Sequence, residues 1–247
     1  MRSLYNDPIL GNKLLCEFLV NEGAGAYIRD ASPNNMSGQL ITPDWVIETM
    51  AYNKVMSLDF ILANTDYVNL GTDAVWDDVA GTNDEITLEV LFYSDATLGT
   101  IQTLVASQVD GTAGVAAFPQ LLVDALGMLL FRPCQDDSGA GAEVSSTPTV
   151  QTAAWKHVVA AYSKSDAVAS MQINGAAEIT STMTGITDIT APGANSVYMG
   201  VRQNFDAGST FENYFDGHMV LFRAWSRRLT VHERGMLYAR AHAKYAV

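Results

Sequence analysis

Most of the chain consists of short runs in which apolar and polar residues alternate, separated by tight-turn dipeptides. The clearest run is Ile86 to Tyr93, and Asn174-Gly175 and Asp216-Gly217 are typical of tight turns because they tolerate a positive φ. This pattern predicts an all-β protein, a two-sheet antiparallel β-sandwich of the jelly-roll kind. The other predicted strands are Ile101 to Val105, Gln120 to Val123, Met128 to Phe131, His157 to Tyr162, Ala169 to Ile173, Val197 to Val201 and His218 to Trp225.

One helix is predicted, and it lies close to the end of the sequence. Thr230-Val231-His232-Glu233 is a capping box, in which the first hydroxyl and the last carboxylate each satisfy a free backbone N–H. The residues that follow are amphipathic, so we expect a short helix packed on the sandwich through Leu229, Met236, Leu237 and Tyr238. The expected organisation is an N-terminal arm over 1–11, the sandwich over 12–228 and the helix over 229–247. The arm either clamps a neighbouring subunit or is a disordered terminus.

The length and composition exclude several classes of protein. A chain of 247 residues with 48% hydrophobic and 17% charged residues buries enough surface to fold without a metal or disulfide staple. No run of about 18 apolar residues occurs, so we expect no membrane insertion. The first ten residues do not resemble a secretory signal. Cys16 and Cys134 are interpreted as free buried thiols, with a disulfide as the alternative.

Charge is unevenly distributed along the chain. The net charge is −13, yet residues 223–247 carry six Lys or Arg against one Glu, which leaves the preceding residues at −18. A strongly acidic body repels phosphates, so we expect no nucleic-acid partner. The basic end either docks on this acidic body or binds an anionic partner.

A series of short motifs occurs in a characteristic order over residues 12 to 240. In chain order they include Leu14-Leu15-Cys16-Glu17-Phe18, Asp30-Ala31-Ser32, Leu58-Asp59-Phe60, Glu85-Ile86-Thr87-Leu88-Glu89-Val90, Trp155-Lys156-His157-Val158-Val159, Gln172-Ile173-Asn174-Gly175, Tyr198-Met199-Gly200 and Phe215-Asp216-Gly217. This order resembles that of the concanavalin A-like lectin/glucanase superfamily, in particular its laminin-G-like and pentraxin-like domains. The resemblance implies a concanavalin A-like jelly roll. It does not specify the function, because this fold hosts lectins, hydrolases and structural modules.

No catalytic constellation is evident in the sequence. The glucan-cleaving members of this superfamily carry an E-x-D-x-x-E strand, which this chain lacks. Glu85 and Glu89 are the nearest pair, but four residues of strand span about 13 Å. Paired glycosidase carboxylates lie about 5–9.5 Å apart. We therefore expect a protein that is not an enzyme, with no catalytic residues.

Calcium is the one cofactor that the resemblance suggests. Pentraxins bind calcium through acidic loops, and the positions of this chain that match give Asp110, Asn204, Asp206 and Glu212 as candidate ligands. Arg202 lies where an acidic ligand is expected, which departs from the pentraxin pattern. The alternative is an ordinary solvated acidic loop, with no cofactor required.

Carbohydrate binding by this fold needs an exposed aromatic ring for stacking and polar groups for the sugar hydroxyls. Two candidate clusters are Trp76 with Asp77, and Phe205 with Asn204. Both rings are equally compatible with burial beneath their loops. Trp155 and Tyr162 are expected to fill the core.

These observations favour a non-catalytic structural or adhesion module. Stand-alone modules of this kind resemble products of tailed-bacteriophage genomes, where they decorate capsids or tail fibres. The resemblance implies a location on the virion surface, partners among other virion or capsid proteins or copies of itself, and glycans of the host or environment. The alternative is a stand-alone, calcium-assisted lectin.

Overall fold

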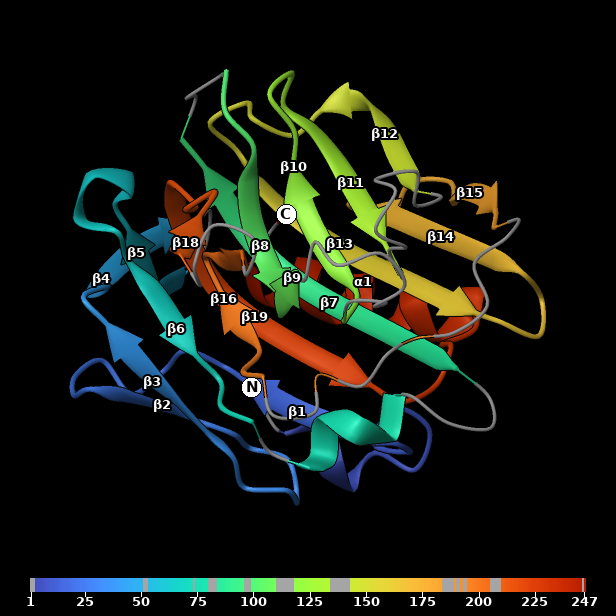
Figure 1. Cartoon of the computed structure of the whole chain (residues 1–247). Coiled ribbons are helices and arrows are strands. Elements are labelled where there is room, and N and C mark those ends of the chain that lie inside the picture. Colours follow the sequence, from blue (N-terminus) through green and yellow to red (C-terminus); the bar gives the residue numbers. More distant parts are fainter. Residues whose placement is uncertain are drawn as a thin grey trace.

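The structure is a computed structural model, and it shows a β-sandwich with a helix on its outer side (Figure 1). It describes residues 3–50, 53–72, 74–79, 84–95, 99–109, 118–133, 143–183, 189, 192, 195–204, 210–245 and 247. Two antiparallel sheets, which we call sheet A and sheet B, form the two layers. The predicted fold class is therefore confirmed.

Sheet A has eight strands among the described residues. In spatial order they are β15 (Ile179–Thr182), β14 (Val168–Ile173), β13 (Trp155–Ser163), β7 (Glu85–Ser94), β19 (Gly217–Trp225), β5 (Asn53–Phe60) and β4 (Asp44–Met50), with β1 (Leu14–Phe18) also paired to β19. The long central strands β7, β13 and β19 alternate inward and outward residues, as the sequence pattern predicts. Inward residues such as Leu88 and Val90 enter the core between the sheets.

Sheet B is the facing layer, and the described part of it also has eight strands. Their order is β12 (Val144–Thr149), β11 (Met128–Arg132), β10 (Gln120–Val123), β8 (Gln102–Ala106), β16 (Tyr198–Met199), β6 (Tyr67–Asn69), β3 (Ser37–Ile41) and β2 (Tyr27–Arg29). A smaller described sheet contains β18 (Thr210–Glu212), β17 (Arg202–Asn204) and β9 (Gln108–Val109). Short 3-10 helices span Leu4–Asn6, Leu62–Asn64 and Ala74–Val79.

Helix α1 (Val231–Tyr245) lies on the outer face of sheet A, behind the sheet in Figure 1. Its start is the predicted capping box: the N–H of Thr230 donates to the carboxylate of Glu233, and the N–H of Glu233 donates to the Thr230 hydroxyl. Leu229 and Leu237 are fully buried, and Met236 packs against the same cluster. This helix is too short and too polar to cross a membrane, and the same holds for every other described helix.

The segment before β1 packs on its own chain. Leu4 and Leu10 are buried with Leu14, Trp225 and α1. The Trp225 indole N–H donates to the carbonyl of Leu10 at 2.7 Å. Residues 3–11 thus complete the cover over one end of sheet A.

A buried network of charges lies beneath this cover. The Arg223 guanidinium on β19 donates to Glu17 on β1 at 2.9 Å and to Glu89 on β7 at 2.8 Å. The Glu89 carboxylate also accepts from the His157 ring on β13 at 2.7 Å, and all four side chains are at most 1% exposed. Against the cost of burial, Arg223 and His157 hold the pKa of Glu89 down at about 2.

We predict that Leu237→Ala lowers the free energy of unfolding by about 2–5 kcal/mol, because it opens a cavity between α1 and sheet A. For a chain of this size that corresponds to a fall in Tm of roughly 4–20 °C. Thermal unfolding followed by circular dichroism checks this. Val231→Ala, on the exposed side of the same helix, is the matched control and should change the Tm little.

The second prediction concerns acid stability. A carboxyl whose pKa falls on folding stabilises the native state above its unfolded pKa, and that contribution is lost as the pH falls through the folded value. For Glu89 the window runs from 4.5 down to about 2. Glu89→Gln should therefore be less stable at neutral pH and show a shallower loss of stability across this window in urea titrations. The exposed Asp78→Asn variant should keep the wild-type slope; an equal slope in all three proteins would contradict the assignment.

Candidate functional site

A row of side chains crosses the outer face of sheet A where α1 ends. The strand register places Trp155 opposite Tyr93, Tyr93 opposite His218, and His218 opposite Asp59. Residues opposite one another on neighbouring strands project from the same face of a sheet. Sheet pairing alone thus brings two aromatic rings, an imidazole and a carboxylate into one line across β13, β7, β19 and β5.

Gly217 allows this row to form. Its φ of +141° favours glycine, and a Cβ there would lie 2.1 Å from the carbonyl oxygen of Tyr93. Only a residue without a side chain lets β19 approach β7 this closely at its first residue. His218 follows directly, which places its ring beside that of Tyr93.

The three rings of the row contact one another. Ring centroids are 5.6 Å apart for Tyr93 and Trp155, 5.7 Å for Tyr93 and His218, and 6.4 Å for Trp155 and His218. These separations are typical of favourable aromatic pairs. Trp155 and Tyr93 are half-buried, so part of each ring faces solvent.

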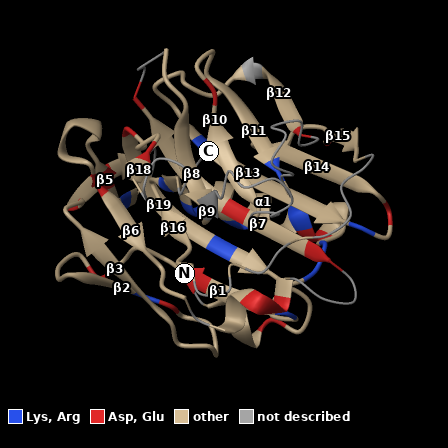
Figure 2. Cartoon of the chain, viewed as in Figure 1, with Lys and Arg blue, Asp and Glu red and all other residues tan. Residues whose placement is uncertain are grey.

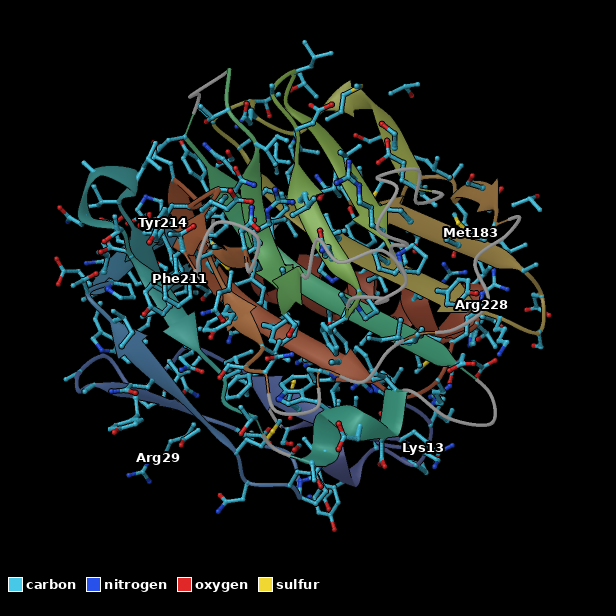
Figure 3. The ribbon with its side chains drawn as sticks, viewed as in Figure 1. Lys13, Arg29, Met183, Phe211, Tyr214 and Arg228 are labelled. Atoms are coloured by element: carbon cyan, nitrogen blue, oxygen red, sulfur yellow. The ribbon has the colours of Figure 1, made fainter. Side chains whose placement is uncertain are left out.

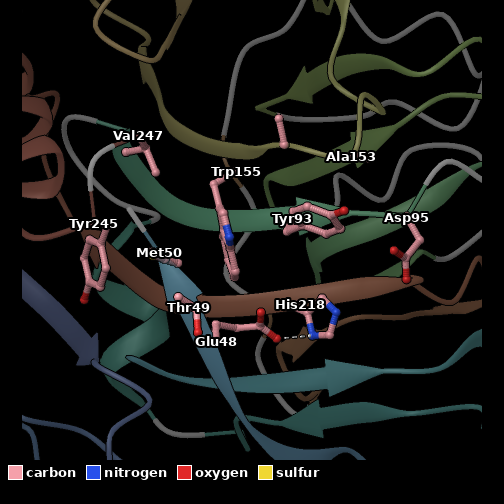
Figure 4. Close-up of a pocket in the computed structure, with 11 residues that line it drawn as sticks. Glu48, Thr49, Met50, Tyr93, Asp95, Ala153, Trp155, His218, Tyr245 and Val247 are labelled. Carbon is pink, nitrogen blue, oxygen red and sulfur yellow. Dashed lines mark ion pairs between the residues drawn. The ribbon is translucent and has the colours of Figure 1, made fainter. Parts of the chain in front are cut away.

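These rings form one wall of a concave pocket of about 640 Å³, shown in Figure 4. We call it the Trp155 pocket. Its other described walls are β4, the residue after β7, the residues before β13 and the end of the chain after α1. The residues that contribute there are Glu48, Thr49, Met50, Asp95, Ala153, Ala154, Tyr245 and Val247.

Carboxylates surround the imidazole of His218. Its Nδ1 lies 3.3 Å from Glu48 Oε1 and 3.6 Å from Asp59 Oδ1, within ion-pair range. Neither contact has hydrogen-bond geometry, so this buried nitrogen makes no hydrogen bond to any described residue. Burial raises the pKa of the Asp59 carboxyl, and His218 opposes that shift.

The sequence pattern did not indicate this pocket. Trp155 was expected in the core, but it has the same strand parity as His157 and faces outward, at the edge of a smaller cluster under α1. Tyr162, of the opposite parity, does fill the core. The alternation of residues along the strand could have indicated that Trp155 faces outward. Val158 and Ala160 face the core, so Trp155, His157 and Val159 face the opposite side.

The first predicted sugar-binding cluster does not have an available ring. Trp76 is fully buried, with centroids 5.6 Å from Phe118 and 6.5 Å from Phe222. It was proposed as either exposed or buried beneath its loop, and the structure shows it buried. Asp77 beside it is exposed, but it has no ring to accompany it.

The second cluster is described only in part, because Phe205 lies outside the described residues. Asn204 is half-buried on β17 and pairs with Thr210 of β18. The ring in that region is Phe211, which Figure 3 labels beside Tyr214; it stacks on Tyr67 at 4.8 Å.

The predicted calcium ligands are likewise only partly described, since Asp110 and Asp206 lie outside the described residues. Glu212 is paired with the Arg202 guanidinium at 2.6 Å, so its oxygen is already held by a cation. The described half of the set therefore fits calcium poorly. Among the described residues no group of three or more His, Cys, Asp or Glu is arranged to hold a metal.

Of the two cysteines, Cys16 is a free thiol whose pKa is raised by burial, and Cys134 lies outside the described residues.

Comparison with solved structures gives matches to receptor-binding domains of bacterial toxins. The chain superposes on the binding domain of botulinum neurotoxin DC in complex with SialylT (TM-score 0.64, 10% identity, 93% of this chain and 52% of that chain). It superposes equally well on the binding domain of Paraclostridial Mosquitocidal Protein 1 (0.64, 14%, 92% and 52%) and on the ligand-binding domain of botulinum neurotoxin serotype D in complex with N-acetylneuraminic acid (0.64, 12%, 93% and 51%). The chain thus spans about half the length of these domains, and identities this low show a shared fold alone.

Among curated proteins no sequence matches the chain. A family model does match: that of the concanavalin A-like lectin/glucanases superfamily, which covers residues 62–233. This region contains every central strand of both sheets and the start of α1, and it agrees with the order of motifs in the sequence. The chain therefore belongs to the concanavalin A-like lectin/glucanases superfamily.

Proposed function

We propose that the protein is a non-catalytic carbohydrate-binding module and that the Trp155 pocket holds the sugar. The observation that carries this proposal is the row in which Trp155 and Tyr93 lie side by side at the wall of a pocket. Binding sites for small ligands are concave, partly aromatic and contain a few convergent polar groups. Their usual volume of about 300–1,000 Å³ includes that of this pocket.

The geometry suits a pyranose. The apolar face of a sugar ring can lie on the exposed part of the Trp155 indole, which offers a rigid apolar surface. Hydroxyl groups at the ring edge would then donate to the carboxylates of Glu48 and Asp95, since ionised carboxylates are strong acceptors. Membership of a superfamily that includes lectins agrees with this use of the fold.

The carboxylates of the pocket support binding better than hydrolysis. A glycosidase presents one carboxyl as an acid and a second as a nucleophile or base on either side of the bond. Here Glu48 and Asp59 both lie against the same nitrogen of His218. These two carboxylates therefore share one cation and do not flank a bond from opposite sides, so we propose that the protein binds glycans without cleaving them.

We also propose that the module acts on the surface of a bacteriophage virion, as a capsid decoration or tail-fibre component that binds host or environmental glycans. Its support is the resemblance of the sequence to stand-alone modules of this kind, together with a rigid sandwich that carries its pocket on an outer face. Partner virion proteins or further copies of the chain would then hold the other faces of the sandwich.

The glycan proposal predicts that Trp155→Ala weakens binding by at least about tenfold, because a central aromatic contact costs more than about 1.4 kcal/mol when removed. The measurement is binding to a glycan array followed by calorimetry on the best ligand, with calcium and then with chelator. Thermal melts confirm that the variant is folded. Tyr27→Ala, which removes a 52% exposed ring from sheet B, is the control and should bind normally. Equal binding by wild type and Trp155→Ala would place the sugar elsewhere.

The virion proposal predicts that particles released from cells carrying the gene contain this chain. Mass spectrometry of density-gradient-purified particles checks it, with the soluble fraction of the same lysate as the control. Recovery of the chain in the soluble fraction alone would contradict the proposal and favour a free lectin.

A further inference from the structure

The electrostatics of the Trp155 pocket lead to the chemical class of its sugar. Glu48 and Asp95 line the pocket directly, and Asp59 lies behind His218. No Lys or Arg is among the described residues that line it. The net charge of the protein is −13, and Figure 2 marks its acidic residues in red and its basic residues in blue along the ribbon. The pocket is therefore a site of negative potential.

The carboxylates of this region repel one another. The pKa of Asp59 is raised first by burial and further by the charges of Asp95, Asp66 and Asp44, and His218 opposes this shift. Like charges that raise a pKa also favour any cation placed among them, because the same field acts on both. The side chain of Asp95 makes no hydrogen bond or ion pair with a described residue, and it lines the pocket directly.

The aromatic rings of the pocket also favour a cation over an anion. The face of an aromatic ring carries a partial negative charge, so Trp155 and Tyr93 attract a cation and disfavour an anion. A ring beside a carboxylate is the usual arrangement for holding an ammonium group. A sugar carboxylate, such as that of a sialic acid, would meet Glu48 and Asp95, while the His218 ring already lies against Glu48 and Asp59, so the sugar carboxylate would be repelled.

We infer that the Trp155 pocket selects a sugar that carries a free ammonium group, that is, a deacetylated amino sugar. This inference rests on the proposed function, and it deepens it by naming the ligand class. The aromatic row of the pocket determines where the sugar binds, and the carboxylates determine that the favoured sugar is positively charged. The ring of the sugar lies on Trp155, and its ammonium group contacts the carboxylate of Asp95.

Calorimetry with two oligosaccharides of equal length tests the inference. Fully deacetylated glucosamine oligomers should bind at least about tenfold more tightly than their N-acetylated counterparts, since a desolvated cation–π contact and a charge-assisted hydrogen bond together exceed that factor. Added salt should reduce the difference, because it screens charges. Asp95→Asn should weaken binding of the deacetylated oligomer more than binding of the N-acetylated oligomer, and should thereby reduce the preference. Asp77→Asn, which removes an exposed carboxylate outside the pocket, should leave the preference unchanged.

Three results would overturn the inference, and they are distinguishable. Equal or tighter binding of the N-acetylated oligomer through Trp155 would refute the ammonium preference and leave the glycan proposal intact. Binding of a simple alkylammonium ion as tightly as the glucosamine oligomer would show that no sugar is selected. No binding of any array glycan would remove the proposed function together with this inference.

Discussion

The rest of sheet A depends on one buried cation, Arg223. Its guanidinium joins Glu17 of β1 and Glu89 of β7, and Glu89 joins His157 of β13. A buried charge is tolerated only when its partners are complete, because removal of one partner leaves an unpaired ion that costs about 3–5 kcal/mol. The cover is part of this arrangement: the N–H of Leu4 donates to Glu17, and α1 places Tyr245 so close to the network that burial raises the pKa of its phenol. The first residues and the last helix therefore fold as parts of the sandwich, although they are the two ends of the sequence.

The Trp155 pocket is open to solvent because helix α1 and the N-terminal residues cover only part of the outer face of sheet A. Outward positions of β7 run from Glu89 through Leu91 to Tyr93, and the first two are buried beneath α1 and its neighbours. Tyr93 lies one step beyond the end of the helix, beside Trp155 and His218, and is half-exposed. One face of one sheet thus carries a buried electrostatic network at one end and an open aromatic pocket at the other. The length of α1 determines the boundary between them.

The sequence predicted those features that depend on neighbours along the chain. Strand parity located the central strands, and the Thr230–Glu233 capping box located the start of α1. It did not distinguish a covered outer face from an exposed one, because parity says which residues share a face but not what lies over that face. Glu89 was therefore considered as one of a pair of catalytic carboxylates, whereas in the structure it is buried and forms an ion pair with Arg223. Trp155 was assigned to the core, but it lies on the outer face of sheet A. Trp76 was compatible with exposure or burial, and tertiary packing buries it.

The distribution of charge explains why the pocket is acidic. Eight of the Lys and Arg residues that the structure describes pair with carboxylates, several of them inside the fold or under α1: Arg132, Lys164, Arg202, Arg223, Arg227, Arg228, Arg234 and Arg240. Because acidic residues outnumber basic ones by 27 to 14, this pairing leaves a surplus of carboxylates on the surface. Where that surplus meets solvent it is screened and has little effect. In the Trp155 pocket, aromatic rings displace much of the water, so the same charges act at short range on whatever enters. Because the Lys and Arg residues are paired elsewhere in the sandwich, His218 is the basic side chain among the described residues that line the pocket, and it faces more than one carboxylate.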